Sequence, residues 1–193
     1  MCLSVLQDPR LHEFLFQIDR DMAADVVQRG CRYCGAVLHS ARYPRKPRGG
    51  PQGLSFEHTV RFSFCCSADG CRRRHTPPSV RFLGRRVFLG AAVLLITAMR
   101  QGPTPKGRRE LSRMFQVSPR TLSRWRTWWR DIFPNSTFWQ RTRARFLPPV
   151  PEVDLPGHLL DRFQGRTLLE RCLLMLKLLS PISSPWALAI GAF

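Results

Sequence analysis

Lysine is scarce in this chain of 193 residues: only Lys46, Lys106 and Lys177 occur among its 31 basic residues, and the others are arginines. Acidic residues are also few, 13 in all, which gives a formal net charge of +18. A guanidinium group presents a planar fork of donors that matches phosphates and guanine edges, whereas an ammonium group is a point charge. A GC-rich genome would raise the share of arginine without any function, but it would not create the net charge. The charge therefore favours a polyanionic partner, above all nucleic acid.

The shortage of acidic residues also argues against a nuclease or transposase whose carboxylates bind metal. Between Arg29 and Arg145 there are 25 basic and only 4 isolated acidic residues, a net charge of +21, while the rest of the chain carries −3. Asp154, Asp161 and Glu170 fall in an apolar tail that is too short to build the sheet of such an active site. We therefore expect a protein that is not an enzyme.

The chain also lacks a long hydrophobic run, and we expect no secretion signal. Its longest apolar stretch, Val87–Met99, is well below the ~20 residues that a membrane-spanning helix needs. The first residues, MCLSVLQDPRLHEF, have no basic region ahead of an apolar one. We expect no membrane partner and a cytoplasmic location, where disulfides are rare. The spacing of the seven cysteines should then reflect metal binding rather than cross-links.

Four of the cysteines are spaced as in a zinc ribbon. Cys31 and Cys34 are separated by two residues and followed by a glycine, and Cys66 and Cys71 form a second pair around a turn-prone Ser-Ala-Asp-Gly. Turns of this kind direct their thiolates at one tetrahedral ion. We predict that the four residues bind a structural Zn²⁺, which leaves no open position for catalysis.

The residues between the two pairs predict a strand that ends at the second pair. In residues 55–66, SFEHTVRFSFCC, apolar and polar side chains alternate with the period of a half-buried strand. Because this strand carries both Cys65 and Cys66 to its end, either thiol can be the third ligand, and His75 is an alternative fourth ligand. Ahead of the ribbon, an amphipathic segment predicts a helix that ends at Gly30; its apolar face, at helical spacing, consists of Leu11, Phe14, Leu15 and Ile18.

Residues 108–125, RRELSRMFQVSPRTLSRW, have the pattern of a helix-turn-helix. Ser118 is a suitable N-cap of the second helix, and Pro119 suits its first position. The inner faces of the two helices and the turn are expected to consist of Leu111, Met114, Phe115, Val117, Leu122, Trp125 and Trp129. In such a motif, the start of the second helix contacts bases in the major groove of DNA. The residues predicted to do so are Arg120, Thr121, Ser123, Arg124 and Thr127.

Further arginines are expected to contact DNA phosphates, which adds affinity without selecting sequence. They follow the second cysteine pair, begin the next predicted helix, and continue through the helix-turn-helix into the basic segment beyond it. These residues are Arg72, Arg73, Arg74, Arg85, Arg86, Arg126, Arg130, Arg141, Arg143 and Arg145.

The segment Val117–Trp125 resembles the helix-turn-helix of bacterial transposases and related regulators. The order of a ribbon (Cys31/Cys34, Cys66/Cys71) and a helix pair resembles the InsA-like zinc-ribbon proteins encoded by insertion sequences. This resemblance implies binding to double-stranded DNA at the ends of a mobile element, a transposase as protein partner, and a location at the bacterial nucleoid. It does not extend to the first 25 or the last 50 residues. Gln116 departs from the glycine common in such turns, so the turn needs a left-handed non-glycine residue or extra length.

Two other functions stay open. A transcriptional regulator would share the sequence-selective binding, whereas an assembly scaffold would bind nucleic acid with a steep salt dependence and almost no sequence preference.

The predicted fold is α+β, a small zinc ribbon followed by a mainly helical part. Its segments are an N-terminal helical segment (1–30), the zinc ribbon (31–83), the helix-turn-helix domain (84–133), a basic, proline-rich linker (134–157) and an apolar C-terminal helix (158–193). The last helix is too apolar to stand alone in water. It is expected to pack on the N-terminal helix of its own chain or to dock a partner, which includes a second copy of the chain.

Overall fold

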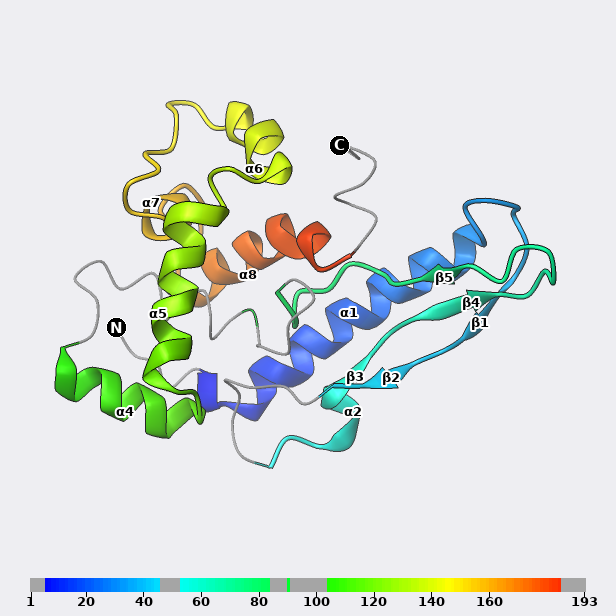
Figure 1. Ribbon diagram of the computed structural model, residues 1–193, viewed down its shortest axis with the longest axis horizontal. Coiled ribbons are helices and arrows are strands. Elements are labelled where there is room, and N and C mark those ends of the chain that lie inside the picture. The colour runs from blue at the N-terminus through cyan, green and yellow to red at the C-terminus, as the bar shows by residue number, and fades with distance from the viewer. Residues whose placement is uncertain (1–5, 46–52, 84–89, 91–103, 185–193) are drawn as a thin grey trace.

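The computed structural model describes residues 6–45, 53–83, 90 and 104–184. The fold is α+β, as predicted, with helices forming most of it and two small antiparallel sheets at one end (Figure 1). The apolar stretch 87–99 and the predicted phosphate contacts Arg85 and Arg86 lie outside the described residues. Among the helices that are described, none combines the length and the hydropathy needed to cross a membrane.

The longest helix, α1, spans Pro9–Arg29. The side chain of Asp8 caps its first turn, and Gly30 ends it with a φ of 69°, a left-handed value that glycine tolerates. Phe14, predicted to face the core, is 50% exposed. The buried face of α1 includes two polar side chains, His12 and Asp19, beside the apolar Leu11, Leu15 and Ala23.

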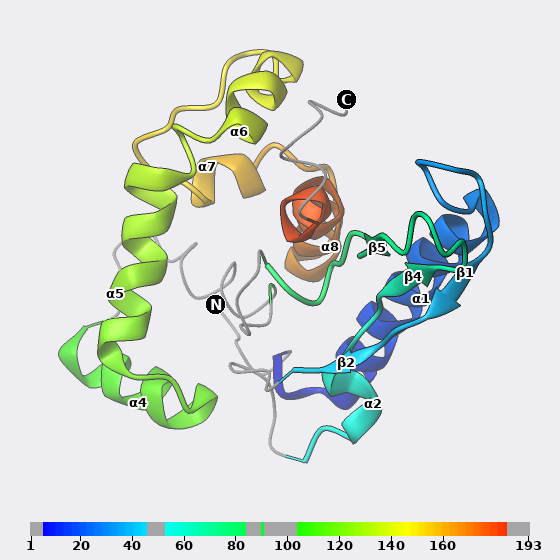
Figure 2. The ribbon, with the colours of Figure 1, turned by 45° about the vertical axis from the view of Figure 1, so that its right-hand side comes forward.

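Two short antiparallel sheets follow α1. Strands β1 (Leu38–Ser40), β4 (Phe64–Cys66) and β5 (Arg74–His75) form one sheet in the order β1–β4–β5, and β2 (Tyr43–Pro44) pairs with β3 (Val60–Arg61) in the other. Figures 1 and 2 both show the sheets lying along the second half of α1. A small hydrophobic cluster joins them to this helix; its buried members are Ala23, Cys31, Leu38, Phe62, Phe64 and Cys66.

The predicted strand over residues 55–66 is wrong in its first half. Residues Phe56–Thr59 form a short helix, α2, and Phe56 is 70% exposed. Further along, Arg61 and Ser63 are buried as completely as the phenylalanines between and beside them. The segment is covered on both sides, so the alternation of apolar and polar residues does not separate an inner face from an outer one.

Helices α4 (Pro105–Phe115) and α5 (Pro119–Thr127) are joined by a three-residue turn, and α5 continues into a π-helical turn, η2 (Trp128–Ile132). Gln116 has a φ of 50° in this turn, so the left-handed non-glycine residue is the alternative that the chain adopts. The Oγ atom of Ser118 accepts the N–H of the third residue of α5 at 3.2 Å, as its predicted capping role requires.

The predicted inner faces of α4, α5 and the turn are buried wherever their side chains are described. Trp129 is fully buried, and its ring centroid lies 4.8 Å from that of Phe133. Nothing is described of the side chain of Met114. The other predicted members are all at most 5% exposed: Leu111, Phe115, Val117, Leu122 and Trp125.

Residues 134–157 are not a linker, contrary to the prediction. They contain helix α6 (Thr137–Thr142) and a 3-10 turn, η3 (Arg143–Arg145). Trp139 is fully buried and its Nε1 donates to the carboxylate of Glu152 at 2.6 Å. Prolines and arginines make up a third of this segment, but a few apolar side chains are enough to hold it against the core; they are Phe138, Trp139, Val150 and Leu155.

The C-terminal segment packs within its own chain. Its described part contains α7 (Gly157–Leu160), α8 (Leu168–Leu179) and a 3-10 turn, η4 (Ser180–Ser183). Figure 2 looks along α8 and shows it between α5 and the sheets. Its buried side chains, Cys172, Met175, Leu176 and Leu179, belong to the same cluster as Leu11 and Leu15 of α1.

One hydrophobic core joins most of the predicted segments. The cluster that contains α8 also includes Val80 and Phe82 from the end of the predicted ribbon, Trp125 from α5 and Val150 from the predicted linker. The predicted boundaries after residues 83, 133 and 157 therefore do not separate independent hydrophobic cores. Among the described residues, only those at the sheet end form a hydrophobic cluster of their own.

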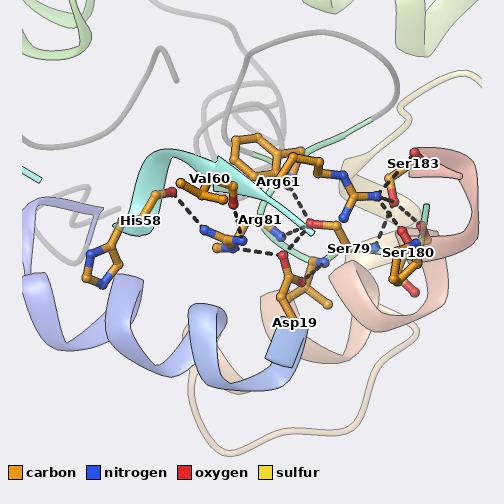
Figure 3. Close-up of polar contacts among 11 residues, drawn as sticks. Asp19, His58, Val60, Arg61, Ser79, Arg81, Ser180 and Ser183 are labelled. Carbon is orange, nitrogen blue, oxygen red and sulfur yellow. Dashed lines mark hydrogen bonds and ion pairs between the residues drawn. The ribbon is translucent and has the colours of Figure 1, made fainter. Parts of the chain in front are cut away.

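A buried ion pair connects α1 to the residues that follow the sheets (Figure 3). Arg81 and Asp19 are at most 2% exposed, and the Nε of Arg81 donates to the Asp19 carboxylate at 2.8 Å. The same guanidinium donates to the carbonyls of His58 and Val60, and the hydroxyl of Ser79 donates to Asp19 at 2.6 Å. Burial lowers the pKa of Arg81, and the adjacent Asp19 opposes that shift. The pair thus fixes α1, β3 and the chain after β5 to one another.

A second buried arginine ties the end of α8 to the same region. Arg61 donates to Ser183 Oγ at 3.3 Å, and this hydroxyl oxygen also accepts the N–H of Ser79 at 2.7 Å. The Ser184 hydroxyl donates to the carbonyl of Thr76 at 3.0 Å. Burial lowers the pKa of Arg61 to about 10, so it stays charged at neutral pH. These contacts explain why Arg61 points inward from a strand whose pattern predicts it outside.

Candidate metal centre and nucleic-acid interface

Cys31, Cys34, Cys66 and Cys71 meet at the far end of the sheets, with their four Sγ atoms all within 4.8 Å of one another. The Sγ atoms of Cys31 and Cys71 are 3.7 Å apart, and those of Cys34 and Cys66 are 3.5 Å apart. A tetrahedral ion with metal–sulfur bonds of ~2.3 Å would set these edges at about 3.8 Å. The four side chains therefore form a cluster that could hold a metal ion.

The backbone around the first cysteine pair is wrapped tightly. The N–H of Gly35 donates to the carbonyl of Cys31 at 2.7 Å, and the N–H of Cys31 donates to the carbonyl of Ala36 at 2.8 Å. Gly30 and Gly35 have φ values of 69° and 72°, and a Cβ on Gly30 would lie 2.9 Å from the Gly35 carbonyl oxygen. Glycine is needed at both positions to fold the turn around the two sulfurs.

The wider second pair is closed by a turn, as the sequence suggests. Cys66 ends β4, and the N–H of Cys71 donates to the carbonyl of Ala68 at 2.9 Å. Arg72, just beyond the turn, takes a left-handed φ of 44°. The N–H of Cys66 also donates to the carbonyl of Arg73 at 3.0 Å, which holds the two cysteines together.

The geometry separates Cys66 from its competitors for the third and fourth positions. Adjacent residues of a strand point to opposite faces, and the Sγ of Cys65 donates to the carbonyl of Arg72 rather than joining the cluster. The Nε2 of His75, in β5, lies 3.3 Å from the Sγ of Cys31, and His75 is only 4% exposed. His75 is thus a hydrogen-bonding neighbour of the cluster rather than one of its four members.

The cluster has one thiol that ionises readily. Burial raises the pKa of Cys31, but hydrogen bonds from the N–H groups of Tyr33 and Cys34 and from His75 outweigh this effect and lower the pKa to about 6. Burial raises the pKa of Cys66 to about 12, and the thiols around it act in the same direction. A bound cation is what allows all four thiols to ionise, so metal binding should release protons.

The outer face of α5 presents arginines that no described acidic residue neutralises. Arg120, Ser123, Arg124 and Thr127 are exposed, and none of the described carboxylates forms an ion pair with these two arginines. Thr121 differs from the prediction, since it is only 8% exposed and its hydroxyl lies 3.0 Å from that of Ser118. Because Thr121 sits one turn from Ser118 on the capped, inner side of α5, it is not available to contact a base.

The predicted phosphate contacts that are described lie on the surface, but they differ in their neighbours. Arg130 is paired with Asp131 at 2.7 Å, Arg143 with Glu152 at 3.4 Å, and Arg72 lies 3.9 Å from Asp69. A neighbouring carboxylate weakens the attraction of these three for a phosphate. The others are exposed and form no ion pair with the described acidic residues: Arg73, Arg74, Arg126, Arg141 and Arg145.

The sheets carry a basic and aromatic surface, of which the sequence patterns singled out only Arg73 and Arg74. Arg73 lies over the ring of Tyr33 at 4.1 Å from its centroid, and Arg32 lies over the same ring at 5.0 Å. Arg45 and Arg74 lie over the ring of Tyr43 at 5.0 and 5.9 Å. The signal in the sequence was the dipeptide Arg-Tyr, which occurs at 32–33 and 42–43 and includes both tyrosines of the chain.

The two basic surfaces lie on opposite sides of the molecule. Figures 1 and 2 show α4 and α5 on one side, the sheets on the other and α8 between them. The surface around the cysteine cluster and the face of α5 therefore cannot contact the same few base pairs.

Comparison of the chain with protein-family models, curated proteins and solved structures finds no match.

Proposed function

We propose that the protein binds double-stranded DNA in a sequence-selective way, without catalysis, through a helix-turn-helix formed by α4 and α5. The single observation that carries this proposal is the exposed face at the start of α5, where no described carboxylate pairs with Arg120 or Arg124. Guanidinium groups in such positions bind the O6 and N7 atoms of guanine in the major groove. Ser118 and the left-handed Gln116 support the proposal, since they fix the angle at which α5 leaves the turn.

We propose that the cysteine cluster binds a structural Zn²⁺ and makes the sheet end a zinc ribbon. Four thiolates in a tetrahedron suit zinc, and all four positions are filled by protein, which leaves none for a substrate. Within the described part of the chain, this is the only group of three or more metal-binding side chains. A site of this kind lends no support to a nuclease whose carboxylates bind metal.

Zinc content tests the metal proposal. The purified chain is expected to carry about one zinc ion, and cobalt substitution is expected to give the absorption bands of tetrahedral thiolate coordination. The Cys66→Ser variant should lose the metal, while the matched Cys65→Ser variant should keep it. Equal loss in both variants would contradict the assignment of Cys66.

Selection of random duplex DNA by the zinc-loaded chain, at roughly physiological salt, tests the DNA proposal. A motif should be enriched by the wild type and absent with the double variant Arg120→Ala/Arg124→Ala. The matched control is Arg141→Ala/Arg145→Ala, which should weaken binding equally for all sequences and reduce the salt slope by roughly 0.9 for each phosphate that is no longer neutralised. Binding without any enriched motif would favour the scaffold instead.

We also propose that the protein serves a mobile element, as partner of a transposase. This association rests on the resemblance of Val117–Trp125 and the cysteine pairs to InsA-like proteins. It predicts that the selected motif recurs in inverted orientation at both ends of the DNA element that encodes the chain. A motif found only upstream of unrelated genes would support a transcriptional regulator.

A further inference from the structure

A cavity of about 530 Å³ lies between α1 and the β2–β3 sheet. Aromatic rings form much of its wall, contributed by Phe16 of α1, Tyr43 of β2 and Phe62. Phe56, at the start of α2, also lines it and is 70% exposed. This volume falls in the ~300–1,000 Å³ range of small-molecule sites, so the cavity can take one flat group the size of a nucleobase.

The charge of the cavity selects an anion. Arg20 and Arg42 line it, against a single carboxylate from Glu57. Arg42 lies over the ring of Phe62 at 5.0 Å, and Arg20 donates to the amide oxygen of Gln17 at 3.2 Å. Neither guanidinium forms an ion pair with a described carboxylate. Two guanidinium groups beside an aromatic wall match a phosphate joined to a base, because the guanidinium fork binds phosphate oxygens and the ring stacks on the base.

The cavity also connects to the basic surface of the sheets. Tyr43 lines the cavity, and the guanidinium of Arg74 lies over the same ring at 5.9 Å. Arg74 follows directly on Arg72 and Arg73, which lie beyond the second cysteine pair. A nucleic-acid backbone that follows these arginines would therefore reach the mouth of the cavity at Tyr43.

From these observations we infer that the cavity binds one unpaired nucleotide of a DNA strand, with its base against Phe16 and Phe56 and its phosphate on Arg20 and Arg42. This inference deepens the proposed DNA-binding function and rests on it. It separates two roles, since α5 would bind the duplex and the cavity would bind a base that has left the duplex, as at a strand end.

The test compares flush-ended duplexes with duplexes that carry a short single-stranded overhang, using the full zinc-loaded chain. Base–aromatic stacking is strong enough that the overhang should tighten binding by about tenfold. A fluorescent adenine analogue in the overhang should be quenched when its base enters the cavity. Both effects should disappear in Phe56→Ala and in Arg20→Gln/Arg42→Gln. These side chains are exposed, so the changes leave the core intact.

The matched controls are Phe14→Ala and Arg29→Gln, which alter an exposed ring and an exposed arginine on α1 outside the cavity. Both should keep the advantage of the overhang. Equal binding of flush and overhanging duplexes by the wild type would overturn the inference, and so would an advantage that persists in the cavity variants. An acidic peptide with a terminal phenylalanine and a dinucleotide can each be added to displace the quenched base. If the peptide displaces it at lower concentration than the dinucleotide, the cavity binds a protein segment instead.

The flush duplex separates this inference from the proposed function. Loss of flush-duplex binding in Arg120→Ala/Arg124→Ala tests the proposed role of α5. Loss of the tighter binding to overhangs in the cavity variants, with unchanged flush-duplex binding, tests the cavity inference.

Discussion

Cys65 and Cys66 illustrate what a residue pattern can predict and what it cannot. The spacing of the cysteines predicted the cluster, but two adjacent thiols at a strand end gave no basis for a choice. The pairing of β1 with β4 decides it, since Cys66 pairs with the buried Leu38 and faces the cluster, while Cys65 pairs with the exposed His39 and points to the other face of the strand. For the same reason His75 could be proposed as a ligand but not as a partner of Cys31, because that contact depends on the register of β5.

His75 is expected to strengthen metal binding without being a ligand. Replacing a hydrogen-bonding partner of a metal ligand typically costs ~10–100-fold in affinity, so His75→Ala should weaken zinc binding by that amount while the chain still binds one ion. Competition with a chromophoric chelator measures the affinity. His39→Ala, on the exposed strand across from Cys65, should leave it unchanged. A complete loss of zinc from His75→Ala would mean that the imidazole is a ligand.

Asp19 is expected to matter for stability far more than its neighbours. Asp19→Asn leaves the Arg81 guanidinium buried without its carboxylate, which should lower the free energy of unfolding by ~3–5 kcal/mol. Asp21→Asn, an exposed change on the same helix, should have an effect near zero. Urea denaturation of both variants measures the difference. Equal midpoints would show that the buried pair is dispensable.

At the scale of elements, helices that begin at a capping side chain could be predicted and the irregular segments could not. Ser118 and Pro119 mark the start of α5, and Gly30 marks the end of α1, because these residues act on their own backbone. In residues 55–66 the alternation did not reveal the helical turn at Phe56–Thr59. The inward position of Arg61 could not be predicted either, because its partner Ser183 lies far away in the chain. The linker was mispredicted because composition does not reveal that Trp139 lies in a core.

The turn between α4 and α5 is expected to be strained by its side chain. A left-handed backbone costs a non-glycine residue ~1–2 kcal/mol, so Gln116→Gly should raise the free energy of unfolding by about 1 kcal/mol. Ser123→Gly, on the exposed helical face of α5, should lower it by a similar amount. Thermal denaturation of both variants measures whether the free energy of unfolding rises or falls. A loss of stability in Gln116→Gly would show that the Gln116 side chain contributes a contact that outweighs its strain.

At the scale of the whole molecule, the two hydrophobic clusters predict a partial response to metal loss. Cys31 and Cys66 are buried members of the small cluster at the sheets, while α5 and α8 belong to the large one. Chelation of zinc should therefore increase amide hydrogen exchange in β1, β4 and β5 by orders of magnitude and leave α5 and α8 protected. A parallel rise of exchange in α8 would show that the molecule unfolds as one unit.

The domain division is where sequence patterns fail most clearly. Hydrophobic periodicity within a segment says which face is buried, but not against which other segment it packs. Val80, Trp125 and Val150 come from three predicted segments and share one cluster, which no local pattern of their own segments could show.

The length of helix α1 sets the distance between the two ends of the molecule. The first turn of α1 lies toward the end of the molecule that holds α4 (Figure 1), and its last turn leads into Cys31. With 21 residues and a rise of 1.5 Å each, it extends for about 32 Å. One turn of B-DNA covers about 34 Å, so equivalent groove faces recur at nearly the same interval. Under the proposed DNA-binding function, α1 would act as a molecular ruler, and the insertion of one helical turn between Asp19 and Gly30 would shift the cysteine end relative to the grooves of the double helix.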